Sequence, residues 1–233
     1  RERGFRIEKR SQMLGHLSEG KMVMAVAGTH GKTTTSTLAA WLNHAAAGEG
    51  SAFLGGISTN FASNLVLGEG RRLVVEADEY DRSFLRLWPD VAVITATDAD
   101  HLDIYGTAEA MVEAFEQFAS QIKEGGSLIL KQGVAFHFDT KGRNLYRYSC
   151  DAGGDFHAEN IRLIEGGHYR YDIVLPDGRI EDCELGILGK VHIENSVAAV
   201  AMLWCAAKRE GKALDREAVR RALRDFAGVK RRM

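Results

Sequence analysis

The segment from Met22 to His44 constrains the fold more than any other part of the sequence. Met22 to Ala27 is a short, continuous apolar run that leads into a Gly-rich stretch. Thr33 to His44 then carries apolar residues at helical spacing. A continuous apolar run bounded by turn residues is typical of a strand buried on both faces. The segment therefore predicts a strand, a loop and a helix in succession.

The same alternation continues along the chain. Arg72 to Ala77 and Val91 to Ala96 are apolar runs too short for buried helices, so we expect both to be interior strands. Thr107 to Lys123 has apolar residues at helical spacing, and Ser127 to Leu130 follows as a further strand. Together these elements predict an α/β fold with a doubly wound, mostly parallel sheet, in which ligands bind at the carboxyl ends of the strands.

The character of the sequence changes in the region from Leu145 to Leu188. Short alternating segments such as Tyr169 to Leu175 are separated there by Gly-Gly and Pro-Asp-Gly turns, which predicts a small antiparallel hairpin region over residues 145–188. Two helices are expected after it, from His192 to Arg209 and from Asp215 to Phe226.

The loop between the first predicted strand and helix has the composition of a phosphate-binding loop. Backbone amides at a helix N-terminus suit an anion, Lys32 adds positive charge from the solvent-facing end of the loop, and the Thr33 hydroxyl can bind magnesium. Val26 stands where the full motif has a glycine, so the loop is a variant. The alternative is a Gly-rich turn whose lysine is incidental. The predicted nucleotide-binding residues here are Gly28, Thr29, His30, Gly31, Lys32, Thr33 and Thr34.

Carboxylates gather where the strand from Arg72 to Ala77 ends. Glu76 is followed by Asp78, Glu79 and Asp81 in the same turn. Carboxylates this close repel one another without a cation nearby, so the turn predicts a metal site in which Glu76 reaches a magnesium ion beside the phosphate-binding loop. The alternative is a solvated acidic loop.

His101 lies in the polar segment that follows the strand from Val91 to Ala96. The carboxyl ends of neighbouring parallel strands meet at one edge of a sheet, so this segment is expected to converge on the cleft that holds Glu76. A lone loop histidine is more often a surface or core residue than a ligand, but the neighbouring sites favour a metal ligand.

Charge and composition exclude several classes of partner. The 30 Lys and Arg residues are balanced by 32 Asp and Glu residues, which argues against nucleic acid or an anionic membrane as the main partner. No apolar run approaches the roughly 20 residues of a membrane helix, and no signal peptide is recognisable, so we expect a cytoplasmic protein. Cys150, Cys183 and Cys205 are far apart and are expected to be packing residues.

The phosphate-binding loop, the strand-ending glutamate and the histidine segment together resemble the Mur ligase family. Central domains of this family carry Gly-Thr-His/Asn-Gly-Lys-Thr/Ser, a strand-ending Glu, and a later Asp-His-x-Asp-x-Tyr. This chain has them at residues 28–33, at Glu76 and at residues 100–105. The resemblance covers nearly the whole chain and implies ATP and Mg²⁺ as cofactors.

The resemblance also implies roles for individual residues. Lys32, Glu76 and His101 would be the catalytic residues. Thr33 and Glu76 would help to hold one magnesium ion and His101 a second. Arg232 would approach the outer phosphate of the nucleotide.

Two departures from the family pattern concern the adenine base and the second metal ion. The family's His-Asn-x-x-Asn before the late helix appears here as Val191-His192-Ile193-Glu194-Asn195. Only Asn195 matches among the residues that contact adenine in relatives, and His192 is expected to replace an amide. Several relatives have a carbamylated lysine where Thr107 to Gln121 has no lysine, and Glu113 or Glu116 is expected to supply the charge.

The stretch from Glu76 to Leu85 looks most like the branch of the family that joins L-alanine to UDP-N-acetylmuramate, through an acyl phosphate, in peptidoglycan precursor synthesis. By resemblance, residues 1–20 are a linker from an N-terminal UDP-binding domain, residues 21–228 are the central ATPase domain, and residues 229–233 begin a linker to a C-terminal domain. UDP-N-acetylmuramate and L-alanine are the partners expected for the full-length enzyme. The chain alone is expected to bind nucleotide weakly and to turn over nothing.

Two alternatives share the nucleotide site. The first is the related recycling ligase, which attaches a whole tripeptide to the same UDP-sugar. The second is a non-catalytic nucleotide-binding module that gates a partner, a hypothesis that leaves the acidic turn and His101 without a task.

Overall fold

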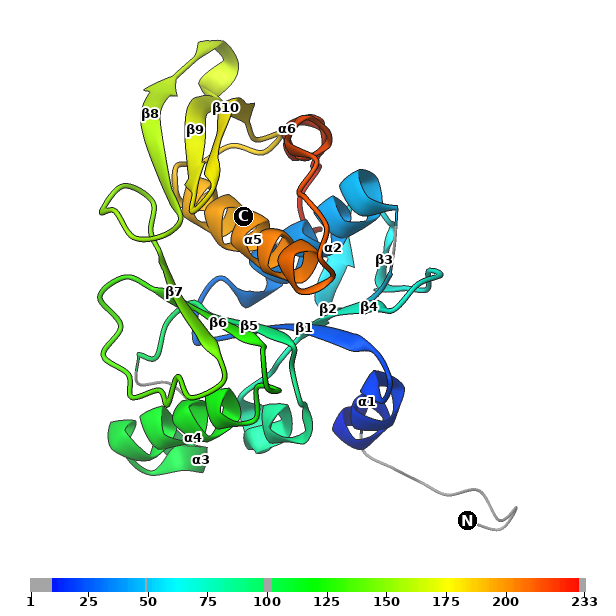
Figure 1. Cartoon of the computed structure of the whole chain (residues 1–233), viewed down its shortest axis with the longest axis vertical. Helices are drawn as coiled ribbons and strands as arrows, with labels where there is room; N and C mark the ends of the chain where they lie inside the picture. The colour runs from blue at the N-terminus through cyan, green and yellow to red at the C-terminus, as the bar shows by residue number, and fades with distance from the viewer. Residues whose placement is uncertain (1–9, 49, 99–101, 231–233) are drawn as a thin grey trace.

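The computed structural model describes residues 10–48, 50–98 and 102–230. Its main element is a seven-stranded sheet with the order β3-β2-β4-β1-β5-β6-β7 (Figure 1). All neighbouring strands are parallel except β2 and β3, which form an antiparallel pair. The sheet extends in both directions from β1, which confirms the predicted doubly wound α/β fold. The strands are β1 (Met22–Ala27), β2 (Ser51–Ser58), β3 (Ser63–Val66), β4 (Arg72–Glu76), β5 (Val91–Ile94), β6 (Ser127–Lys131) and β7 (Asn144–Tyr148).

Helices cover both faces of this sheet (Figure 1). One face packs against α2 (Lys32–Ala47) and α5 (Val191–Arg209). The other face packs against α4 (Ala108–Ser120) and the 3-10 helix η1 (Tyr80–Arg86). Each face therefore has its own apolar core.

The central strand β1 shows how the sequence supplies both cores. Consecutive side chains of a strand point to opposite faces. Met24 and Val26 accordingly lie in the core with α2 and α5, whereas Val23 and Ala25 lie in the core with α4 and η1. This double burial is why β1 reads as a continuous apolar run rather than an alternating one.

Side-chain caps fix the start of two predicted helices. Thr107 precedes α4, and its Oγ1 accepts a hydrogen bond from the Ala110 amide at 3.2 Å. Asp215 precedes α6 (Arg216–Arg224) and accepts one from the Ala218 amide at 2.9 Å. Each cap satisfies a backbone donor that the helix itself leaves unpaired.

A smaller antiparallel sheet packs on α5 and α6, above the main sheet in Figure 1. Its buried residues Tyr171 and Ile173 join the core of the α5 face, and the Tyr171 hydroxyl lies 2.7 Å from Ser196 Oγ on α5. Its strands are β8 (His157–Leu163), β9 (Tyr169–Leu175) and β10 (Gly178–Glu184), in the order β10-β9-β8.

The predicted boundary of the antiparallel region, residues 145–188, is wrong at its start. Asn144–Tyr148 forms β7, which pairs in parallel with β6 as the last strand of the main sheet. The antiparallel sheet begins only at His157. As an edge strand β7 is mostly half-exposed, with only Tyr148 fully buried, so its sequence lacks the continuous apolar character of a central strand.

The described parts of both segments expected to be linkers, residues 10–20 and 229–230, contact the body of the domain. Residues Arg10–Ser18 form helix α1, and Leu14 packs against the core of the α4 face. At the other end, Val229 forms a β-bridge with Ser58, and the Lys230 amide donates to the Ile57 carbonyl at 2.8 Å. Apolar packing at Leu14 and backbone pairing at Val229 and Lys230 therefore attach the described parts of these segments to the domain.

At the amino ends of the strands, the Asp90 side chain accepts hydrogen bonds from β1, from the segment after α4 and from α5. Its Oδ2 accepts hydrogen bonds from the Val23 amide at 2.9 Å and from Lys123 Nζ at 2.7 Å. Its Oδ1 accepts from Arg209 Nε, in the last residue of α5, at 3.0 Å. The carboxylate is 8% exposed and is therefore paired on both oxygens within the fold.

No helix in the described ranges is long and apolar enough to cross a membrane. Cys183 and Cys205 are buried, and Cys150 is half-buried; all three are free thiols. Burial raises the pKa of both Cys183 and Cys205 to about 12. These thiols are therefore poor nucleophiles, as expected for packing residues.

Candidate functional site

The predicted phosphate-binding loop lies between the carboxyl end of β1 and the start of α2. Gly31 caps α2 in the left-handed conformation with φ 78°, and its carbonyl accepts from the Thr35 amide at 3.0 Å. Val26, where the full motif has a glycine, is a fully buried strand residue. The loop is therefore shorter than the full motif, while still ending at a helix N-terminus suited to an anion.

Glu76 lies at the carboxyl end of β4, beside the start of α2. Its Oε1 accepts a hydrogen bond from Thr33 Oγ1 at 2.9 Å, and its Oε2 accepts from Ser36 Oγ at 3.2 Å. The Gly55 amide of β2 also donates to Oε2, at 2.9 Å. The structure thus brings together the two residues predicted to share a metal ion, and it adds Ser36 and Gly55, which sequence reasoning missed.

Lys32 forms an ion pair with Glu79, with Nζ 2.7 Å from Oε1. The Lys32 side chain is 14% exposed and the Glu79 side chain is fully buried. The sequence led us to expect Lys32 at a solvent-facing end of the loop. The structure shows instead that its side chain is largely buried. The lysine ammonium is the cation that relieves repulsion within the acidic turn.

The carboxylates of the acidic turn have separate partners. Glu76 accepts from hydroxyl groups, Glu79 pairs with Lys32, and Asp78 Oδ1 accepts from the Tyr80 amide at 3.1 Å. Within the described ranges, no group of three or more His, Cys, Asp or Glu side chains is placed to hold a metal ion. The predicted metal site at this turn stays a prediction, in which Glu76 is the carboxylate that lies beside Thr33.

Tyr105 ties the segment after β5 to the acidic turn. Its hydroxyl donates to the Glu79 carbonyl at 2.6 Å, and the Arg82 guanidinium lies 5.3 Å from its ring centroid. Burial, and then the charge of Glu79, raise the pKa of Tyr105 to about 12. The hydroxyl consequently stays protonated and remains a donor at neutral pH.

Asn195, predicted from the family pattern, lies beside the phosphate-binding loop. Its Oδ1 accepts from Thr35 Oγ1 at 3.3 Å, and its Nδ2 lies 3.3 Å from His192 Nδ1. A Cβ added at Gly31 would come within 3.1 Å of Asn195 Oδ1. Burial lowers the pKa of the half-buried His192, which favours a neutral ring at this edge of the site.

The remaining predicted residues of the loop have distinct surroundings. His30 is exposed, with Nε2 3.5 Å from Asp98 Oδ2. Thr29 is buried, and its amide donates to the Ala96 carbonyl at 3.1 Å. Within the described part of the chain, Thr29 Oγ1 is a buried hydroxyl without a hydrogen-bond partner. Thr34, in the first turn of α2, is half-buried.

Four further predicted positions divide into two that lie outside the described residues and two that lie on α4. His101 and Arg232 lie outside the described residues, so their roles stay predictions. Glu113 is exposed on α4. Glu116 Oε1 accepts from the His137 amide at 2.9 Å, so this carboxylate already supports a loop backbone.

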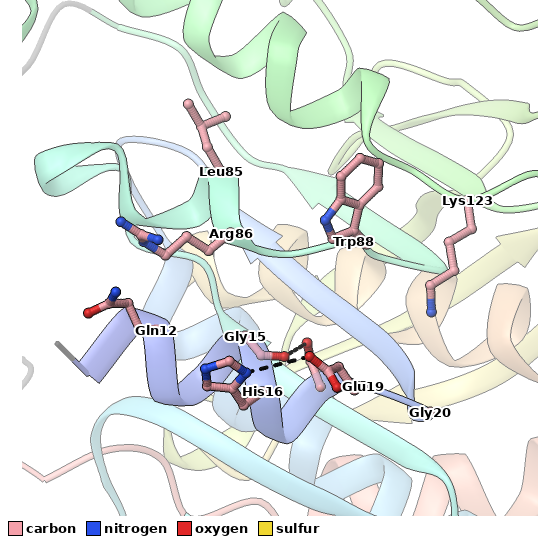
Figure 2. A pocket seen from close by; sticks show the side chains of 10 residues that line it. Gln12, Gly15, His16, Glu19, Gly20, Leu85, Arg86, Trp88 and Lys123 are labelled. Carbon is pink, nitrogen blue, oxygen red and sulfur yellow. Dashed lines mark hydrogen bonds and ion pairs between the residues drawn. The ribbon is translucent and has the colours of Figure 1, made fainter. Parts of the chain in front are cut away.

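A separate hollow of about 590 Å³ lies at the amino ends of the strands, away from the phosphate-binding loop. Figure 2 shows Trp88 and Lys123 on one side of the hollow and His16 and Glu19, which lie side by side, on the other. Trp88 is 60% exposed. The hollow contains none of the residues predicted from the sequence motifs, and ligands of a doubly wound sheet bind at the opposite edge.

The chain is similar to known proteins along most of its length. Residues 26–203 match the family model of the Mur ligase middle domain. The chain is 49% identical to a UDP-N-acetylmuramate–L-alanine ligase from Phocaeicola vulgatus, over all of this chain and 49% of the relative. It is 45% identical to the enzyme of the same name from Parabacteroides distasonis, with the same coverage. The chain thus spans about half the length of the curated relatives it matches.

Two solved structures share the fold. A UDP-N-acetylmuramate–alanine ligase from Thermotoga maritima has a TM-score of 0.76 at 24% identity, over 95% of this chain and 48% of the other. A murein peptide ligase from Psychrobacter arcticus has a TM-score of 0.75 at 24% identity, over 100% of this chain and 52% of the other. With its phosphate-binding loop, its strand-ending glutamate and the match over residues 26–203, the chain belongs to the Mur ligase family and contains its middle domain.

Proposed function

We propose that this chain is the ATP-binding central domain of a ligase that joins L-alanine to UDP-N-acetylmuramate through an acyl phosphate. The observation that carries the proposal is the convergence of the phosphate-binding loop, Lys32 and the Thr33–Glu76 pair at one edge of the sheet. The choice of L-alanine rests on the names of the relatives at 40–49% identity.

The loop is suited to a polyphosphate by backbone and side chain together. The first turn of α2 offers unpaired amides next to a positive helix end. Lys32 Nζ has three donors, so it can keep its contact with Glu79 and still donate to a phosphate oxygen. Charge neutralisation and positioning by such groups are sufficient for phosphoryl transfer, without a covalent enzyme intermediate.

The residues beside the loop fit a magnesium ion. Thr33 Oγ1 and the Glu76 carboxylate are hard oxygen donors, 2.9 Å apart at the start of α2. Mg²⁺ is commonly bound through one or two such groups together with substrate phosphates. When bound there, the ion would neutralise charge on the phosphates. We further propose that His101 contributes to a second ion and that Arg232 approaches the outer phosphate.

The proposed domain division follows from the same family. Residues 21–228 would be the central domain, with residues 1–20 and 229–233 leading to domains that bind the UDP group and the amino acid. UDP-N-acetylmuramate and L-alanine are then partners of the full-length enzyme. The use of cellular ATP favours a cytoplasmic location.

Calorimetric titration of the chain with ATP, with and without MgCl₂, tests the nucleotide site. We expect weak, magnesium-dependent binding that is lost in Lys32→Ala and kept in Lys21→Ala, whose lysine donates to the Gly70 carbonyl far from the loop. Equal ATP affinity in the wild type and Lys32→Ala would contradict the proposed role of the loop.

The full-length parent enzyme tests the amino-acid specificity. Phosphate release that requires UDP-N-acetylmuramate and L-alanine supports the proposal. Phosphate release with a tripeptide in place of L-alanine would instead indicate the recycling ligase; this chain also shares the fold of a murein peptide ligase. Nucleotide binding without turnover of either acceptor would indicate a non-catalytic module.

A further inference from the structure

Thr95 lies directly beneath the phosphate-binding loop, although it belongs to none of the motifs. It follows the last residue of β5 and is 5% exposed. Its amide donates to the Ala27 carbonyl at 3.1 Å. Its hydroxyl approaches the same carbonyl at 3.2 Å and donates to the His30 carbonyl. One side chain thus contacts the loop at both its start and its end.

The loop is shaped to accept this hydroxyl. A Cβ added at Gly28 would lie 2.3 Å from Thr95 Oγ1 and 2.8 Å from the Ala96 amide, closer than real Cβ atoms come to other atoms. Gly28 also has φ 121°, which side chains rarely allow. The Thr29 amide completes the contact by donating to the Ala96 carbonyl at 3.1 Å. The Thr95 hydroxyl therefore occupies space that is free only because residue 28 is a glycine.

The direction of the His30 carbonyl matters for an anion. In a trans peptide the C=O and the following N–H point in opposite directions, because the unit is planar. A hydrogen bond that holds the His30 carbonyl toward Thr95 consequently turns the Gly31 N–H away from β5. A carbonyl oxygen turned the other way would present negative charge to a phosphate and remove a donor from it.

We propose that Thr95 is a positioning residue that sets the orientation of the His30–Gly31 peptide, and so aims a backbone donor of the loop at the phosphates of the nucleotide. This inference rests on the proposed nucleotide-binding function. It assigns the end of β5 a direct part in building the phosphate site, in addition to leading into the segment that contains His101.

Two substitutions separate the hydroxyl from the shape of the side chain. Thr95→Val keeps the shape and removes the donor, whereas Thr95→Ser keeps the donor. Titration with ADP and MgCl₂ should show about three- to tenfold weaker binding for Thr95→Val, the effect of one lost hydrogen bond. Thr95→Ser should bind within about twofold of the wild type. Equal ADP affinity of Thr95→Val and the wild type would overturn the proposal.

A measurement without nucleotide keeps the proposal separate from the function it rests on. Amide exchange followed by NMR in the nucleotide-free chain should be faster at Thr29 in Thr95→Val than in the wild type or Thr95→Ser. Buried amides of β1 should keep their exchange rates, which distinguishes a local effect from global unfolding. If the wild-type chain binds no ADP, the proposed function of this chain fails, and unchanged exchange at Thr29 would then overturn the role of Thr95 as well.

Discussion

Replacing Gly55 with alanine should displace the Glu76 carboxylate from the start of α2. Gly55 lies in β2, and its amide donates to Glu76 Oε2 at 2.9 Å. A Cβ at this position would lie 2.2 Å from Oε1 and 2.4 Å from Oε2. These distances are far below van der Waals contact, so the carboxylate cannot stay where it is. The strand backbone itself accepts alanine, because Gly55 does not have a positive φ.

The size of the effect follows from the contacts that Glu76 would lose. A displaced carboxylate loses the hydrogen bonds from Thr33 at 2.9 Å and from Ser36 at 3.2 Å. A hydrogen bond to a charged group contributes about 1.5–3 kcal/mol, and we take the lower end because Glu76 is partly exposed to water. If the Thr33–Glu76 pair holds the metal ion, the loss of the Thr33 contact alone should weaken magnesium-dependent ATP binding by about 1.5 kcal/mol, which is about tenfold.

Calorimetric titration with ATP at several MgCl₂ concentrations measures this change, and urea unfolding shows whether the fold is kept. The matched control is the same substitution in a Glu76→Ala background, where the methyl group has no carboxylate to displace. In a double-mutant cycle Gly55→Ala should then cost little further affinity. An equal loss in both backgrounds would refute the reasoning, because the effect would not pass through Glu76.

Three further predictions concern two ion pairs and the core, and urea unfolding measures each of them. Lys32→Ala removes the ammonium paired with the buried Glu79 and should cost about 3 kcal/mol of unfolding free energy. Adding Glu79→Gln to this variant should recover part of that loss. Equal unfolding free energies of the single and the double variant would contradict the pairing. The Arg72 hydrogen bond lowers the pKa of Glu210 from its ordinary 4.5, so this pair stabilises the fold above that value and the stability is lost as pH falls through the folded-state pKa. The unfolding free energy of the wild type should therefore fall more than that of Arg72→Met between about pH 7 and about pH 3. If the two unfolding free energies fell in parallel, the Arg72–Glu210 pair would not be the source of this pH dependence. Phe84→Ala, at a side chain that is 1% exposed, should cost about 3–5 kcal/mol; a cost below about 1 kcal/mol would show that its surroundings collapse.

The interior of the sheet was predictable because double burial leaves a plain signature. Met22–Ala27 and Arg72–Glu76 are buried on both faces, and their continuous apolar runs identify them as strands. The edge strand Asn144–Tyr148 has no such signature, since solvent meets much of it. Its neighbour in the sheet is set by tertiary packing, so the sequence pattern alone did not distinguish it from the hairpins that follow.

The site was predictable in its motifs but not in its pairings. Lys32 and Glu79 are 47 positions apart, and only the sheet order brings β4 beside β1. Thr95 carries no charge and lies in no motif, so nothing in its local sequence marks its contact with the loop. Gly55 does leave a signal, because a glycine inside a strand often marks a close approach by another group.

The fastening at Asp90 has a mechanical consequence for the opposite edge of the sheet. It joins the start of β1 to Lys123, which follows α4, and to Arg209, which ends α5. The helix layers on the two faces are thereby attached to the sheet at one shared point, Asp90, about which they could rotate as about a fulcrum. A small rotation of one layer against the other produces little displacement at this fulcrum and progressively more toward the carboxyl ends of the strands. The phosphate-binding loop lies at the carboxyl ends of the strands, far from Asp90, so a slight rotation of the layers would displace it the most.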